Sequence, residues 1–149
     1  MLTVDDFRFS APISLRWSDL DEFGHVNNAI YSTYLEEGRI AYFKNGIPWN
    51  WRVEKFLLAR VEINFKRELK MEHDSYIYMR CSSFGKSSFV FDYLIVDKVR
   101  NIEIANARSV QVFIDTETGV PQALSTDIKQ RFINFEGEGN ITDSNAFKD

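Results

Sequence analysis

A single stretch with helical periodicity near the N-terminus is the feature that most limits the folds open to this chain. Residues 27–46, NNAIYSTYLEEGRIAYFKNG, carry one apolar stripe at α-helical spacing, made of Tyr31, Tyr34, Leu35, Gly38, Ala41 and Tyr42. Asn27 or Asn28 can act as the N-cap, and the Gly-Ile-Pro that follows the stripe predicts the helix end. Because Gly38 costs about 1 kcal/mol inside a helix, we expect another backbone to approach it closely.

Alternating apolar patterns on both sides of this helix predict strands. Residues 7–17, FRFSAPISLRW, place six apolar side chains on one face, and Pro12 on the other face predicts an edge strand or a bulge. After the helix, strands are predicted over residues 59–68, 75–84, 86–98 and 102–115, with Val61, Ile63 and Phe65 inward in the first and a bulge in the last. Residues 125–135 predict a short capped helix.

One strand, one long helix and then about four antiparallel strands form an α+β pattern. We expect one curved antiparallel sheet of five or so strands wrapped around the long helix, as a single domain over residues 1–135. Residues 136–149 are polar and predict a C-terminal tail. Because the outer face and edges of such a sheet need cover, we also expect a homo-oligomer.

Composition removes several classes of function. The formal net charge is -4 and there is no long basic run, which argues against nucleic-acid binding. No apolar stretch approaches the roughly 18 residues of a membrane span, and the N-terminus lacks the pattern of a signal peptide. Cys81 stands alone, so no internal disulfide is expected and a cytoplasmic location is the simplest prediction.

Polar chemistry concentrates just before the helix, in DLDEFGHVNN, residues 19–28. Asp19, Asp21 and Gly24 match positions one, three and six of an EF-hand loop, but Phe23 and Ile30 stand where two further ligands are needed. A zinc site is not predicted either, because the two histidines are far apart and lack a spaced ligand set. Capping and turn formation remain an alternative role for the acids and asparagines.

A catalytic role uses the same position at the start of a helix. Unpaired N–H groups and a partial positive charge gather there, and they suit a developing oxyanion. A neighbouring carboxylate can attack a carbonyl carbon or activate a water. This combination fits acyl transfer, and a thioester fits best because a thiol, with a pKa of about 8.5, leaves without strong acid assistance.

Residues 16–43, RWSDLDEFGHVNNAIYSTYLEEGRIAYF, resemble the opening of hotdog-fold acyl-CoA thioesterases of the 4-hydroxybenzoyl-CoA thioesterase type. The D-x-x-G-H-V-N-N core is also similar to the active-site stretch of plant acyl-ACP thioesterases. A looser resemblance extends to about residue 115. It implies a hotdog fold, an acyl-CoA substrate, no metal or other cofactor, and a homodimer or homotetramer with the site between subunits.

The resemblance also implies roles for single residues. Asp21 matches the catalytic carboxylate, as nucleophile or general base, and His25 and Asn28 would assist it. Residues implied to bind substrate are Gly24, Asn27, Glu36, Ala59, Arg60 and Lys86, with Lys66 and Arg67 as further cations for CoA phosphates. Phe23 departs from the plant pattern, which has an asparagine there. Phe23 or Tyr31 would line the acyl pocket.

Other functions fit the same fold. The chain could bind acyl thioesters without turnover, although a carboxylate beside the carbonyl has no purpose in a binding protein. Hotdog domains also serve as hydratases, but those usually carry a different motif farther along the helix. An acyl-ACP substrate in place of acyl-CoA is the third alternative.

Overall fold

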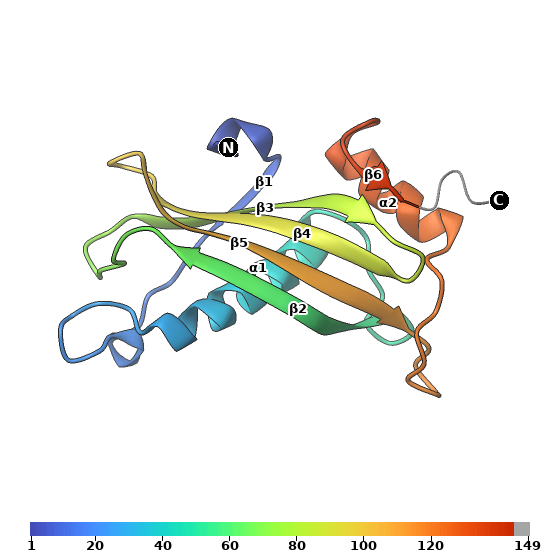
Figure 1. Cartoon of the computed structure of the whole chain (residues 1–149), viewed down its shortest axis with the longest axis horizontal. Helices are drawn as coiled ribbons and strands as arrows, with labels where there is room; N and C mark the ends of the chain where they lie inside the picture. Colours follow the sequence, from blue (N-terminus) through green and yellow to red (C-terminus); the bar gives the residue numbers. More distant parts are fainter. Residues whose placement is uncertain (145–149) are drawn as a thin grey trace.

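The computed structural model describes residues 1–144 and has one six-stranded sheet with a long helix across one face (Figure 1). The strand order is β1-β3-β4-β5-β2, all antiparallel, and β6 pairs with β3 in parallel. The strands are β1 (Phe9–Pro12), β2 (Lys55–Phe65), β3 (Ser75–Phe84), β4 (Ser88–Asp97), β5 (Ile102–Ile114) and β6 (Thr142–Asp143). The helices are α1 (Tyr31–Asn45) and α2 (Thr126–Glu136), with 3₁₀ turns η1 (Val4–Asp6), η2 (Trp17–Asp19) and η3 (Asn28–Ile30).

Helix α1 supplies the centre of the core, as the apolar stripe predicts. Tyr31, Tyr34, Leu35 and Tyr42 are buried, and Ala41 is half-buried. The close neighbours of Gly38 are side chains of β3 and not the backbone that we expected. A Cβ at Gly38 would lie 2.9 Å from the Met79 sulfur and 3.0 Å from Ile77 Cδ1. The glycine therefore lets the helix sit directly on the side chains of β3.

The first strand is shorter than its alternation predicts. Strand β1 covers only Phe9–Pro12, at the edge of the sheet where a proline is tolerated, and the N–H of Ile13 adds one hydrogen bond to the carbonyl of Ser75 in β3. Trp17, expected on the inward face, is 79% exposed and begins η2. After β1 the chain turns into η2, where the Asp19 carboxylate accepts the backbone N–H of Arg16 and the Tyr34 hydroxyl.

Strand β2 forms the opposite edge of the sheet. Val61, Ile63 and Phe65 face the helix side, opposite Ser109, Ala107 and Ala105 of β5, as predicted. The pairing shifts between Leu58 and Arg60, which makes Ala59 a bulge. Of its residues, all but Phe56 and Ile63 are exposed, including the large apolar side chains of Leu57, Leu58, Val61 and Phe65.

Helix α2 packs the C-terminal segment against the sheet. Ser125 caps it as expected, by accepting the N–H of Ile128. The helix ends at Glu136, which is buried, and β6 then joins β3. Glu136, the first residue of the expected polar tail, is thus buried, whereas most of residues 137–144 are exposed, and the rest of that tail lies outside the described residues. No described helix has the length and apolar character needed to cross a membrane.

Candidate active site

The loop that carries residues 19–28 is held by its own backbone. The N–H of Asp21 donates to the carbonyl of His25 at 2.7 Å, and the N–H of Asn27 donates to the carbonyl of Asp19 at 2.9 Å. The N–H of Val26 donates to Leu69 at 2.8 Å, which fastens the loop to the segment after β2. Gly24 has φ +78°, a left-handed conformation that favours glycine. The result is a tight turn that presents Asp21 just before η3 and α1.

Asp19 connects this loop to helix α1 through its buried carboxylate. Its carboxylate is 2% exposed and accepts the Tyr34 hydroxyl at 2.7 Å and the Arg16 backbone N–H at 3.1 Å. Burial by itself raises the pKa of the Asp19 carboxyl, but the hydrogen bonds from Tyr34 and Arg16 outweigh it and leave the pKa below its ordinary value. The Asp19 carboxylate is thus occupied in holding the loop, whereas Asp21 is the acid open to a substrate.

Asp21 has one oxygen engaged and one free. Its Oδ1 accepts the backbone N–H groups of Phe23 at 2.9 Å and His25 at 3.1 Å. No described residue donates to Oδ2. The side chain is exposed and lines a cavity of about 360 Å³ whose other residues are His25, Val26, Asn28, Tyr31, Phe65, Lys66, Arg67 and Glu68. The loop thus fixes the direction of the carboxylate and leaves one oxygen for chemistry.

His25 and Asn28 both line this cavity beside Asp21. The Nε2 of His25 lies 3.0 Å from Oε2 of Glu68, an acid that local sequence patterns do not single out. Asn28 begins η3, and its backbone N–H makes no hydrogen bond with other described residues, as expected for a helix start. Asn27 caps this turn by accepting the N–H of Ala29 at 2.9 Å, so of the two asparagines offered as N-cap it is Asn27 that caps.

Tyr31 and Phe65 form the apolar floor of the cavity. Their rings are in edge-to-face contact, with centroids 4.9 Å apart. Burial raises the pKa of the Tyr31 phenol to about 12, so this hydroxyl stays protonated at neutral pH. Phe23, the other residue expected to line an acyl pocket, is 74% exposed and lies outside this cavity.

Four residues implied to bind substrate do not meet Asp21 within one chain. Glu36, Ala59, Arg60 and Lys86 are exposed and do not line the cavity. Arg60 is paired with Glu62 of its own strand. Ala59 is far away because it lies six positions before Phe65 on β2, about 20 Å at 3.3 Å per residue. A contact between Ala59 or Arg60 and the Asp21 site therefore needs a second chain.

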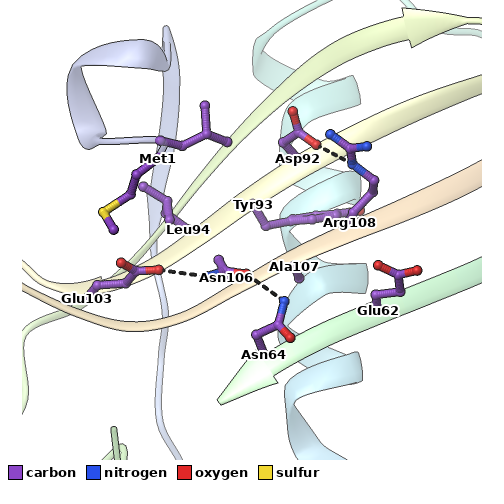
Figure 2. A pocket seen from close by; sticks show the side chains of 11 residues that line it. Met1, Glu62, Asn64, Asp92, Tyr93, Leu94, Glu103, Asn106, Ala107 and Arg108 are labelled. Carbon is purple, nitrogen blue, oxygen red and sulfur yellow. Dashed lines mark hydrogen bonds and ion pairs between the residues drawn. The ribbon is translucent and has the colours of Figure 1, made fainter. Parts of the chain in front are cut away.

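A separate cavity of about 310 Å³ lies on the outer face of the sheet (Figure 2). Its polar side chains bond to one another. Asp92 lies between Arg80 at 3.2 Å and Arg108 at 2.9 Å, and the amide of Asn106 donates to Glu103 and accepts from Asn64. No metal-binding group of three His, Cys, Asp or Glu side chains occurs among residues 1–144.

Comparison with known proteins identifies the family of the chain. A family model described as the thioesterase-like superfamily matches residues 15–132. Uncharacterized protein YsmA of Bacillus subtilis (strain 168) is 34% identical over 90 residues, which are 59% of this chain and 60% of YsmA, so the match spans about three fifths of that relative. Long-chain acyl-CoA thioesterase FadM of Escherichia coli (strain K12) is 25% identical over 122 residues, 80% of this chain and 92% of FadM.

The fold agrees with these matches. The crystal structure of a thioesterase from Thermus thermophilus, complexed with coenzyme A and Zn, has a TM-score of 0.77 and 30% identity, and the match covers 89% of this chain and 97% of that one. The matched residues 15–132 include the loop before α1, α1 itself and strands β2 to β5. The resemblance read from the sequence is confirmed: the chain belongs to the thioesterase-like superfamily and has the hotdog fold.

Proposed function

We propose that this protein hydrolyses acyl thioesters, acyl-CoA or acyl-ACP, and that Asp21 is its catalytic carboxylate. The observation that carries the proposal is the state of Asp21, with Oδ1 held by two backbone N–H groups and Oδ2 free in a cavity. The free N–H of Asn28 lines the same cavity and can donate to the oxyanion of the tetrahedral intermediate. In this proposal the Asn28 N–H and the Asp21 carboxylate act on the same carbonyl group.

Two routes use this arrangement. In the general-base route, Asp21 takes a proton from water as the water oxygen bonds to the carbonyl carbon. The C–S bond then breaks, and the thiolate recovers the proton to give acid and free thiol. In the nucleophilic route, the Asp21 oxygen bonds to the carbonyl carbon and the thiolate leaves, and water opens the resulting anhydride.

The proposed active enzyme is an oligomer in which β2 of one chain pairs with β2 of another. A long edge strand with exposed apolar side chains on both faces is a surface that soluble proteins normally cover. An antiparallel copy related by a two-fold axis near residue 62 would place the partner's Ala59 opposite Phe65. The partner's Ala59 and Arg60 would then approach the Asp21 cavity, in line with the roles implied for these two residues.

Two cationic side chains that could bind the phosphates of CoA or of an acyl carrier lie at the edge of the cavity. Lys66 and Arg67 both line it, directly after β2 ends. Arg67 donates through Nη1 to the carbonyl of Glu103 at 2.8 Å, which leaves its other nitrogens available. We therefore place the pyrophosphate of CoA, or the phosphate of an acyl-carrier prosthetic group, near these two side chains. Lys86 is a weaker candidate because it lies at the β3–β4 turn.

The test is thiol release from a panel of acyl-CoAs by wild type and Asp21→Asn. Asparagine keeps an oxygen that accepts the N–H groups of Phe23 and His25, so the loop persists while the carboxylate is lost. We expect kcat to fall by about 10²–10⁴-fold. Asp5→Asn, at an exposed acid in η1, is the matched control and should change kcat less than about twofold. An equal effect of both substitutions would refute the role of Asp21.

Single turnover in H₂¹⁸O separates the two routes. The general-base route puts ¹⁸O into the acid product, whereas attack of water on the Asp21 carbonyl of an anhydride leaves ¹⁸O in the protein. Thioester binding without thiol release would make the protein a binding module instead. Hydration of an enoyl-CoA without thiol release would make it a lyase.

A further inference from the structure

A second, larger cavity lies at the opposite end of α1. Its volume is about 770 Å³, compared with about 360 Å³ beside Asp21. Its wall consists mainly of apolar side chains, including Ile40, Phe43, Pro48, Trp49 and Trp51. The Phe43 ring lies 4.6 Å from that of Trp49 and 5.5 Å from that of Trp51. We call this cavity the tryptophan groove.

The tryptophan groove is open although its wall is apolar. Ile40 is 50% exposed and Trp51 is 46% exposed. Lys44 is the charged residue of its lining, and no carboxylate of the described residues lines it. A cavity of this size and composition suits an uncharged apolar ligand, because covering aromatic side chains and removing them from water lowers the free energy. Without such cover the groove leaves an apolar patch exposed to solvent, which monomeric proteins rarely do.

Within one chain the nearest residues of the two linings, Tyr31 and Ile40, are nine residues apart on α1, about 14 Å along the helix axis, so the groove and the Asp21 cavity are separate cavities. They lie at opposite ends of α1, whose 15 residues span about 22 Å. Strand β2 runs between the same two ends: the ring of Phe56 contacts Trp51 at 5.6 Å, and Phe65 lines the Asp21 cavity. Figure 1 shows the β2 arrow pointing back toward the start of α1.

Antiparallel pairing of two β2 strands reverses this direction in the partner. With the two-fold axis near residue 62, the partner's Phe56 would lie opposite Glu68, which lines the Asp21 cavity, and in each chain the Phe56 ring contacts Trp51 of the groove. Each Asp21 cavity would therefore adjoin the tryptophan groove of the other subunit, twice in a symmetric dimer.

We propose that the tryptophan groove of one subunit binds the acyl group of the thioester that Asp21 of the other subunit hydrolyses. The substrate class is then thioesters of uncharged apolar acyl groups, of medium chain length or carrying an aryl ring. This inference rests on the proposed function. It makes Trp51 and Ile40 specificity-determining residues that act across the subunit interface.

The first test measures acyl selectivity. Trp51→Ala removes one wall of the groove, and Ile40→Trp fills the groove from the helix side. We expect each variant to lower the ratio of kcat/KM for decanoyl-CoA to that for acetyl-CoA by about tenfold or more. Val99→Ala, at an exposed apolar residue in the β4–β5 turn, should leave the ratio unchanged. An unchanged ratio in both groove variants would overturn the inference.

The second test asks whether the groove acts across the interface. Asp21→Asn and Trp51→Ala chains are co-expressed with different tags in equal amounts. Half of the dimers are then mixed, and each mixed dimer has one site with both native residues, so the decanoyl-CoA activity should reach about a quarter of wild type. If Trp51 served the Asp21 of its own chain, no intact site would form and activity would stay at the average of the two parent variants. That result would overturn the proposal.

A third measurement separates this inference from the proposed function. Binding of non-hydrolysable thioether analogues of decanoyl-CoA and acetyl-CoA is followed by calorimetry. If wild type hydrolyses no thioester, the proposed function fails, and the groove is judged by binding alone. A decanoyl preference that Trp51→Ala reduces by about tenfold or more supports the groove, and a preference that Trp51→Ala leaves intact overturns it.

Discussion

Asp19→Ala is the substitution that tests how the catalytic loop is held. The Asp19 carboxylate joins the loop to α1 by accepting the Tyr34 hydroxyl at 2.7 Å, and both side chains are buried. It also accepts the N–H of Arg16, which starts η2. Removal of the carboxylate leaves the Tyr34 hydroxyl without an acceptor inside the core, and it detaches the segment that precedes Asp21 from the helix.

The structure contains a control for the local part of this effect. Asp6 closes η1 in the same way, by accepting the N–H of Thr3 at 2.7 Å, but Asp6 is exposed and bonds no buried hydroxyl of the described residues. Loss of such a local cap costs about 0.5–1 kcal/mol. The buried bond from Tyr34 to a charged acceptor adds about 1.5–3 kcal/mol. We therefore expect Asp6→Ala to lower the free energy of unfolding by about 0.5–1 kcal/mol and Asp19→Ala by about 2–4 kcal/mol.

Urea unfolding at one fixed protein concentration measures both values, since an oligomer's stability depends on concentration. Tyr34→Phe completes a double-mutant cycle, in which we expect a coupling energy of about 1–3 kcal/mol between Asp19 and Tyr34. Equal effects of Asp19→Ala and Asp6→Ala, or a coupling energy near zero, would refute the reasoning.

The same contact sets a pH dependence with a definite sign. Since the pKa of Asp19 is below its ordinary value of 3.8 in the folded protein, its contribution to stability is complete above that value. The contribution is lost as the pH falls through the folded-state pKa. Wild type should therefore lose more stability than Asp19→Asn between about pH 4 and the acid limit, and neither should change through this group between about pH 5 and 7.

Four further predictions concern other parts of the fold. Glu136 accepts the Tyr42 hydroxyl and the Cys81 N–H, so Glu136→Ala should cost about 1–3 kcal/mol of unfolding free energy by urea titration. Burial raises the pKa of Glu136 despite these bonds, so its contribution to stability is lost as pH rises through that pKa, and Glu136→Gln should flatten this decline. Val61→Lys puts a charge on the exposed β2 edge, and sedimentation should show subunit dissociation with little change in circular dichroism. Glu68→Gln removes the acid 3.0 Å from His25, and we expect a several-fold lower kcat at unchanged KM in the thiol-release assay.

Local patterns predict the main elements well because their causes are local. The apolar stripe places the helix, and α1 ends at Asn45 just before Gly46, where the stop signal stands. Alternation places β2 to β5 and the inward face of β2. These elements follow from side-chain periodicity and capping, which involve neighbours within a few residues.

The errors arise where a contact joins distant residues. Trp17 leaves the predicted strand because Asp19 bonds Tyr34, which lies on the helix 15 residues later. Glu136 belongs to the packed domain because it bonds Tyr42, 94 residues away. Glu68 joins the candidate site only because the segment after β2 folds against the loop before α1. The spacing of residues within one segment cannot predict partners that lie this far away in the sequence.

The exposure of Asp21 in a single chain predicts that hydrolysis depends on oligomerisation. In one chain the carboxylate is exposed, so water reaches the site and weakens the attraction between the Asn28 N–H and an oxyanion. A second subunit on β2 would exclude this water and bring an apolar wall to the same place. Activity per chain should therefore fall together with the dimer fraction on dilution, and Val61→Lys should reproduce at high concentration the low activity of dilute wild type. Constant specific activity through the dissociation midpoint would show that one chain is sufficient.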